Sequence, residues 1–136
     1  MLWPRKIILG IATFVFVGSG CTSEDVETPT PLPSTWAYVQ DEILIPSCGF
    51  SSCHGVASGD LSLNADKAYQ ELLEEPSSQI PTMMRVVPGK PDESYLMWKL
   101  ESHEGIVGDP MPPGGALEDE RLEAIRQWIA NGAVQD

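Results

Sequence analysis

One short stretch, residues 48–55, carries the most reactive combination of side chains in this chain. Cys48 is followed after four residues by Cys53, and His54 comes directly after the second cysteine. Two thiols followed at once by an imidazole can attach haem, because each thiol adds across a vinyl group and the imidazole then binds the iron as the proximal ligand. The usual attachment motif has two residues between its cysteines, whereas this one has four. The longer loop must bulge, which Gly49 makes easier because glycine reaches backbone angles closed to other residues.

Two other chemistries use the same side chains. In an oxidising compartment, Cys48 and Cys53 could form a small disulfide loop with His54 as a bystander. The cysteines could also hold zinc together with His54 and His103, although this spacing is a poor match to structural zinc sites. The residues of the motif leave all three chemistries open.

Met111 is the strongest candidate for a second ligand to iron. It lies between Pro110 and Pro112 in a loop, whereas methionine usually fills gaps in a core. Its thioether is a soft ligand, and the flanking prolines restrict the loop, so the sulfur could be held at the metal with little loss of entropy. The alternatives are simple packing in a surface loop and His103 as the ligand, which would lower the reduction potential. Weaker candidates are Met83, Met84 and Met97.

The first part of the chain, residues 1–20, has the pattern of an export signal. Arg5 and Lys6 precede an apolar run of eleven residues, and small residues follow it. The run is too short to span a bilayer as a helix, which takes roughly 20 apolar residues. Cys21 follows directly and resembles the lipidated cysteine of a bacterial lipobox, with Gly18 where leucine is typical. Lipidation of this cysteine would leave two cysteines for the motif; the alternative is a conventional signal peptide with an incidental thiol.

Residues 21–33 form an acidic, proline-rich linker. Such a segment buries too little apolar surface to fold and stays extended, so it would tether a domain to a membrane. The folded part is then residues 34–136, which is enough for one domain with one core. Loss of the export signal leaves six basic residues against all twenty acidic ones, a net charge of −14. This charge argues against nucleic acid as a partner and favours a positively charged protein, although solubility alone is an alternative reason for it.

The apolar residues of the folded part recur at helical spacing, and no strand pattern of any length is present. Gln40 is expected on the exposed side of the first helix, and Pro46 is expected to end it. Asn64 is expected to cap the second helix, and Asn131 with Gly132 to close the last. The four helices are expected at about residues 35–45, 65–75, 92–101 and 117–130.

The order of these features resembles that of a class I cytochrome c domain. Both have a first helix, a motif of two cysteines and a histidine, small helices, a loop with methionine before proline, and a closing amphipathic helix. The resemblance covers residues 36–134 and is closest to exported bacterial cytochrome c domains. The segments that carry it are Asp60–Leu63, Ala68–Tyr69, Arg85–Gly89, Ser94–Leu96, Lys99–Leu100, Met111–Pro112 and Ile125–Ala133.

This resemblance implies an all-α, class I cytochrome c-like domain of about four short helices around one covalent haem c. Cys48 and Cys53 would be the attachment points, His54 the proximal ligand and Met111 the distal ligand. The first and last helices would cross and pack together behind the haem edge.

The function implied by the resemblance is electron transfer, without enzymatic activity, because a haem with both axial positions filled has no place for a substrate. The partners would be redox proteins with a basic docking face, and a lipid on Cys21 would hold the protein at the periplasmic side of the cell envelope, with the outer membrane preferred. One alternative is a haem enzyme or gas sensor with an open distal position. Another is a structural or binding lipoprotein without haem, in which Cys48 and Cys53 form a disulfide.

Overall fold

The computed structural model describes residues 30–55, 60–65 and 67–136. In this part of the chain the fold is all-α, with helices joined by loops, one isolated β-bridge and no strand. The predicted fold class is therefore confirmed at the level of secondary structure. The predicted export signal, residues 1–20, and the predicted lipidation site, Cys21, lie outside the described residues.

The first helical rod is longer than predicted. It begins after Thr35, whose Oγ1 accepts a hydrogen bond from the backbone N–H of Tyr38 at 3.3 Å. It continues through Pro46, the predicted end, and reaches the first cysteine of the motif. Its three consecutive segments are α1 (Trp36–Tyr38), the π-helix η1 (Val39–Leu44) and α2 (Ile45–Cys48).

The π-helix explains why Pro46 does not end the rod. A proline within an α-helix has no N–H to donate, and its ring clashes with the carbonyl four residues back, here that of Glu42. Proline is tolerated in the first turn of a helical segment, and Pro46 lies in the first turn of α2, directly after the wider turns of η1. The Glu42 carbonyl accepts a hydrogen bond from Nη1 of Arg121 at 3.3 Å. The chain can therefore remain helical as far as Cys48.

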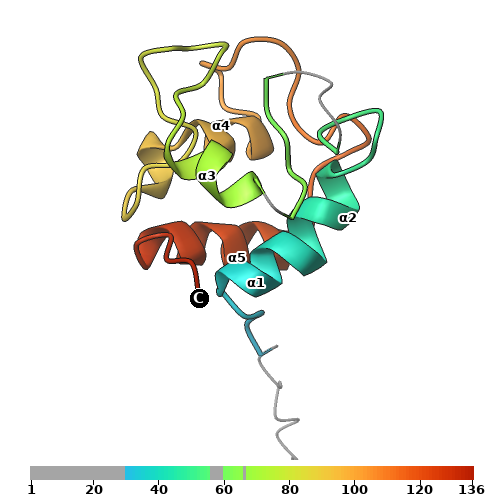
Figure 1. The fold of residues 1–136 in the computed structure, drawn as a ribbon, viewed down its shortest axis with the longest axis vertical. Coiled ribbons are helices and arrows are strands. Elements are labelled where there is room, and N and C mark those ends of the chain that lie inside the picture. The colour runs from blue at the N-terminus through green and yellow to red at the C-terminus, as the bar shows by residue number, and fades with distance from the viewer. Residues whose placement is uncertain (1–29, 56–59, 66) are drawn as a thin grey trace, which may run out of the picture.

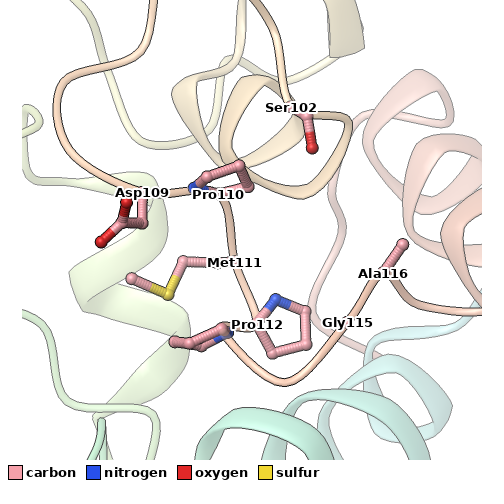
Figure 2. Close-up of a pocket in the computed structure, with 8 residues that line it drawn as sticks. Ser102, Asp109, Pro110, Met111, Pro112, Gly115 and Ala116 are labelled. Atoms are coloured by element: carbon pink, nitrogen blue, oxygen red, sulfur yellow. The ribbon is translucent and has the colours of Figure 1, made fainter.

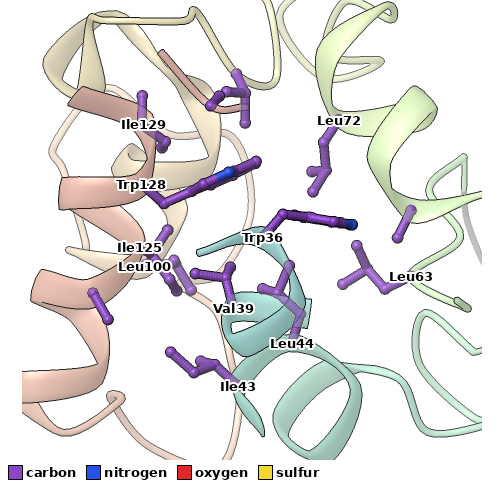
Figure 3. Close-up of a cluster of buried hydrophobic side chains, with 14 of the residues drawn as sticks. Trp36, Val39, Ile43, Leu44, Leu63, Leu72, Leu100, Ile125, Trp128 and Ile129 are labelled. Carbon is purple, nitrogen blue, oxygen red and sulfur yellow. The ribbon is translucent and has the colours of Figure 1, made fainter. Parts of the chain in front are cut away.

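The first rod packs against the last helix, as predicted. This last helix, α5 (Asp119–Ala130), is crossed by the rod of α1, η1 and α2 in Figure 1. Figure 3 shows the indole rings of Trp36, from the rod, and Trp128, from α5, beside one another in the core, with their centroids 5.0 Å apart. The C-terminus returns to the start of the rod, where Oδ1 of Asp136 accepts a hydrogen bond from the Trp36 N–H at 2.8 Å. The predicted closure of α5 by Asn131 and Gly132 is confirmed, since both N–H groups bond to carbonyls of its last turn.

Helices α3 (Ala68–Leu73) and α4 (Tyr95–Leu100) lie on the other side of α5 from the C-terminus (Figure 1). The second predicted helix starts later than expected, and Asn64 does not cap it with its side chain: the carbonyl of Asn64 instead accepts from the N–H groups of Lys67 and Ala68. The third predicted helix is divided into a 3₁₀ turn and an α-helix. The second predicted helix corresponds to α3, and the third corresponds to η2 (Pro91–Glu93) followed by α4.

The prediction that Gln40 is exposed is wrong. Its side chain is buried, and Nε2 donates a hydrogen bond to the carbonyl of Ala65 at 2.9 Å. A buried amide needs such a partner, because losing its hydrogen bonds to water has a free-energy cost. Gln40 thereby fastens the first rod to the segment that leads into α3. Helical periodicity could not show this, because the partner lies 25 residues further along the chain.

One core connects the first rod, α3, α4 and α5 (Figure 3). Cys48 also belongs to this core. The largest fully buried side chains are Trp128, Ile43, Leu44, Leu72, Met97, Ile125, Ile129, Val39 and Val86.

Candidate functional site

The loop with the two cysteines and the histidine is folded tightly on itself. The N–H of His54 donates to the carbonyl of Cys48 at 3.1 Å, and the N–H groups of Cys53 and Gly55 both donate to the carbonyl of Phe50, at 2.8 and 2.9 Å. A side chain at Gly55 has no room, because its Cβ would lie 2.2 Å from the carbonyl oxygen of Gly49. The four residues between the cysteines therefore form a compact bulge that brings the ends of the motif together.

Cys48 is the buried cysteine of the pair. It ends α2, belongs to the core and is only 8% exposed. No disulfide joins it to Cys53 within the described part of the chain. Burial, with a smaller contribution from the nearby Cys53, raises the pKa of the Cys48 thiol to about 11. Cys53 is half-buried, and its Sγ contacts the Ser52 hydroxyl at 3.8 Å.

This raised pKa predicts a specific loss of stability in alkaline solution for the protein with both thiols unmodified. An unfolded thiol loses its proton near the ordinary value of 9.0, whereas folded Cys48 keeps its proton until about pH 11. The free energy of unfolding should therefore be highest below pH 9 and fall by about 2–3 kcal/mol by pH 11, at about 1.4 kcal/mol per pKa unit. Urea titrations under reducing conditions, compared between the wild type and Cys48→Ala, measure this contribution.

The matched control is Cys53→Ala, which should keep most of the alkaline loss because burial of Cys48 is the larger cause. Other groups titrate in the same pH range, so the informative quantity is the difference between wild type and Cys48→Ala. Parallel curves for these two proteins from pH 8 to 11 would show that Cys48 is not buried as described.

His54 has the orientation that a metal-binding histidine needs. Its Nδ1 lies 3.2 Å from the carbonyl oxygen of Leu61. A carbonyl oxygen only accepts hydrogen bonds, so in the neutral ring Nδ1 carries the hydrogen and Nε2 keeps its lone pair. Metal-ligating histidines commonly donate their other ring nitrogen to such a carbonyl, which fixes both tautomer and ring orientation. The carbonyl of His54 also accepts from the N–H of Leu63 at 2.6 Å, which holds the backbone of the two segments together.

Met111 lies in the loop between α4 and α5. Its backbone N–H donates to the carbonyl of Lys99 at 2.9 Å, and its side chain is partly buried against the core to which Cys48 belongs. In Figure 2 the thioether points away from Ser102 and Ala116. Met111, Ser102 and Ala116 all line a pocket of about 370 Å³ beside the loop. The other residues that line this pocket are Asp109, Pro110, Pro112, Pro113 and Gly115.

The competing ligand candidates have other surroundings. His103 is exposed, its ring stacks on that of Trp98 with centroids 3.9 Å apart, and its Nδ1 accepts from the N–H of Gly105 at 3.0 Å. Met97 is fully buried in α4, as expected of a core residue. Met83 and Met84 are partly buried and lie in the irregular segment before η2. Of the candidate residues, Met111 is the one that combines a loop position with contact to the core.

Two residues that sequence reasoning did not single out hold the Met111 loop. Nζ of buried Lys99 donates to the carbonyls of Val107 at 2.9 Å and Asp109 at 2.6 Å. Tyr95, one helical turn earlier on α4, accepts from the N–H of Val107 at 3.1 Å through its hydroxyl. Burial lowers the pKa of Lys99, and the nearby Asp109 carboxylate opposes this effect. The sequence contained a sign of this role, because Lys99 interrupts the most apolar stretch of α4, between Met97 and Leu100.

Two thiols, an imidazole held through its Nδ1 and a thioether are the groups that hold a covalently attached haem. No group of three His, Cys, Asp or Glu side chains that could hold a metal ion occurs in the described ranges. Among the described helices, none is both long enough and apolar enough to cross a membrane. Comparisons with protein families, with curated proteins and with solved structures found no match to this chain.

Proposed function

We propose that this protein is an exported monohaem c-type cytochrome that carries electrons in the cell envelope, with its helical domain arranged as in class I cytochromes c. The observation that carries this proposal is the hydrogen bond from Nδ1 of His54 to the Leu61 carbonyl. With the hydrogen on Nδ1, Nε2 keeps its lone pair, and His54 directly follows the second cysteine of the motif. A bystander histidine needs no such orientation, whereas a metal ligand does.

Each protein group has a defined part in this proposal. Cys48 and Cys53 each add sulfur and hydrogen across one vinyl group, so two thioether bonds form and no atom leaves. His54 provides the proximal nitrogen, and Met111 provides the distal sulfur from the loop that Lys99 and Tyr95 hold. The haem supplies one-electron chemistry at its iron, and the pairing of histidine with methionine raises its reduction potential.

The fold supports electron transfer rather than catalysis in this proposal. His54 and Met111 would both hold the iron, which would leave no position for a substrate. The crossed rod and α5 share one close-packed core with Cys48, so the groups around the iron move little when its charge changes. Small rearrangement favours rapid transfer through an exposed edge to a docked partner, and such encounters use small, transient interfaces.

The net charge of the chain suggests the kind of partner. The chain has 20 acidic and 8 basic residues, so a positively charged redox protein would be attracted over long distances. A lipid on Cys21 and the linker to residue 33 would keep the domain near a membrane surface. The membrane tether requires the export and the amino-terminal processing predicted from the sequence.

The deciding test is whether haem stays on the chain after denaturation. The full chain is produced together with a cytochrome c maturation system, run on a denaturing gel and stained for haem. We expect a stained band at the mass of the chain and a reduced pyridine haemochrome spectrum of the c type. A colourless chain in which Cys48 and Cys53 are joined by a disulfide would overturn the proposal and leave a helical lipoprotein without haem.

A further inference from the structure

Three hydrogen bonds between α4 and the Met111 loop converge on a single residue, Lys99. Its ammonium group donates to two carbonyls of the loop, those of Val107 at 2.9 Å and Asp109 at 2.6 Å. Its own carbonyl accepts from the N–H of Met111 at 2.9 Å. Lys99 therefore contacts the loop on both sides of Pro110, immediately before the proposed ligand.

The burial of Lys99 indicates that its hydrogen bonds to the loop offset the free energy lost when its ammonium group leaves water. Lys99 is 8% exposed, and placing an ammonium group inside a protein is unfavourable unless hydrogen bonds replace its water. Lysine offers three donors, and two of them are used by the loop carbonyls. Burial lowers the pKa of Lys99, as expected for a charge removed from water. A lysine whose only task was solubility would lie at the surface, as Lys90 does.

The helix that carries Lys99 is a rigid support. Its neighbours Met97 and Leu100 are buried in the core. Tyr95 lies one turn earlier on the same face; its hydroxyl accepts from Val107 N–H at 3.1 Å and donates to Oε1 of Gln79 at 2.8 Å. Movement of the loop away from α4 would leave several of these polar groups unpaired, which makes the closed loop strongly favoured.

We propose that Lys99 is the positioning residue for the Met111 thioether, and that its contacts set how tightly this sulfur competes for the iron. The proposal rests on the proposed function, because it concerns the distal ligand of an attached haem. Lys99 acts on the iron only through the loop: it holds Val107 and Asp109 against α4, and Met111 follows two residues later. Weakening these contacts should let the thioether leave the iron more often, without removing the haem.

The test compares three variants of the haem-loaded full chain. Lys99→Met removes the ammonium donors while keeping an unbranched apolar side chain of similar length, and Lys99→Arg keeps a charged donor group. Lys90→Met is the matched control, because Lys90 is an exposed lysine that pairs with Glu93 at 3.0 Å. The readouts are the methionine–iron charge-transfer band of the ferric protein and the apparent Kd for added imidazole, which competes with the thioether.

We expect Lys99→Met to weaken the charge-transfer band and to lower the apparent Kd for imidazole by about tenfold or more, the effect of losing one or two net hydrogen bonds. Lys99→Arg should give values of both readouts closer to the wild type than those of Lys99→Met. Lys90→Met should give wild-type values. Tyr69→Phe controls for general loss of stability, because it removes a 2.9 Å hydrogen bond from α3 to the Ala133 carbonyl, which does not involve the Met111 loop. If Lys99→Met does not accumulate, Lys99→Gln, with a shorter donor, should show the same change to a smaller extent.

The outcomes separate this inference from the proposed function. A wild-type chain with covalent haem and a methionine band, whose Lys99→Met variant binds imidazole within about twofold of Lys90→Met and Tyr69→Phe, overturns the role of Lys99 and leaves the cytochrome standing. A wild-type chain without covalent haem overturns both proposals at the first measurement.

Discussion

Replacing Cys48 and Cys53 together by alanine should abolish covalent haem on this chain. Each thioether bond uses the sulfur of one of these two cysteines, so the double variant has no sulfur in the motif with which to hold haem. After production with the maturation system, the double variant should give no haem stain on a denaturing gel, against a full band for the wild type. Helical content, measured by circular dichroism, indicates whether the variant chain is folded.

The single variants make this test more specific. Cys48→Ala and Cys53→Ala should each keep some stain through the remaining thioether, with a haemochrome band shifted to longer wavelength because one vinyl group stays unsaturated. Ser51→Ala is the matched control, since it changes an exposed side chain within the same loop. Full staining of the double variant would show that haem reaches the chain by another route, or that the stain reports a different protein.

Replacing Met111 by alanine should remove the methionine–iron charge-transfer band and lower the reduction potential by on the order of 0.1 V, because axial ligands spread haem potentials over about 0.8 V. The stain on a denaturing gel should not change, because the thioether bonds do not involve Met111. Absorption spectroscopy of the ferric protein and a potentiometric titration provide the two measurements.

Two matched variants show whether the effect belongs to Met111. Met83→Ala changes a partly buried methionine outside the loop, and His103→Ala removes the imidazole that stacks on Trp98. Both should keep the band and the potential of the wild type. An unchanged spectrum for Met111→Ala would exclude this residue as the ligand. A wild-type spectrum that lacks the methionine band and changes in His103→Ala would assign the role to His103.

The helices of the domain were predictable because their signals are local. Apolar residues at helical spacing placed all four helical regions, and Asn131 with Gly132 marked the end of α5. The errors arose where distant residues decide the outcome. Pro46 does not end the first rod, because a π-helix precedes it and Arg121 of α5 bonds the Glu42 carbonyl.

Other errors have the same physical origin. The position of Gln40 on the first helix predicts a surface residue. It is instead buried, and its side chain donates a hydrogen bond to the Ala65 carbonyl. Phe50, between the two cysteines, is apolar, yet it is 58% exposed. Whether a side chain is buried depends on the groups it meets in the folded chain, and these groups are distant in the sequence.

The sequence by itself determined which groups are available for chemistry: the two cysteines, the adjacent histidine and the methionine between prolines. Their types and spacing are properties of neighbouring residues, so they can be read without a structure. Only the tertiary structure decided how these groups are held. The Leu61 carbonyl orients the His54 ring, and Lys99 fastens the Met111 loop to α4, because both contacts form only when segments seven to ten residues apart fold back on one another.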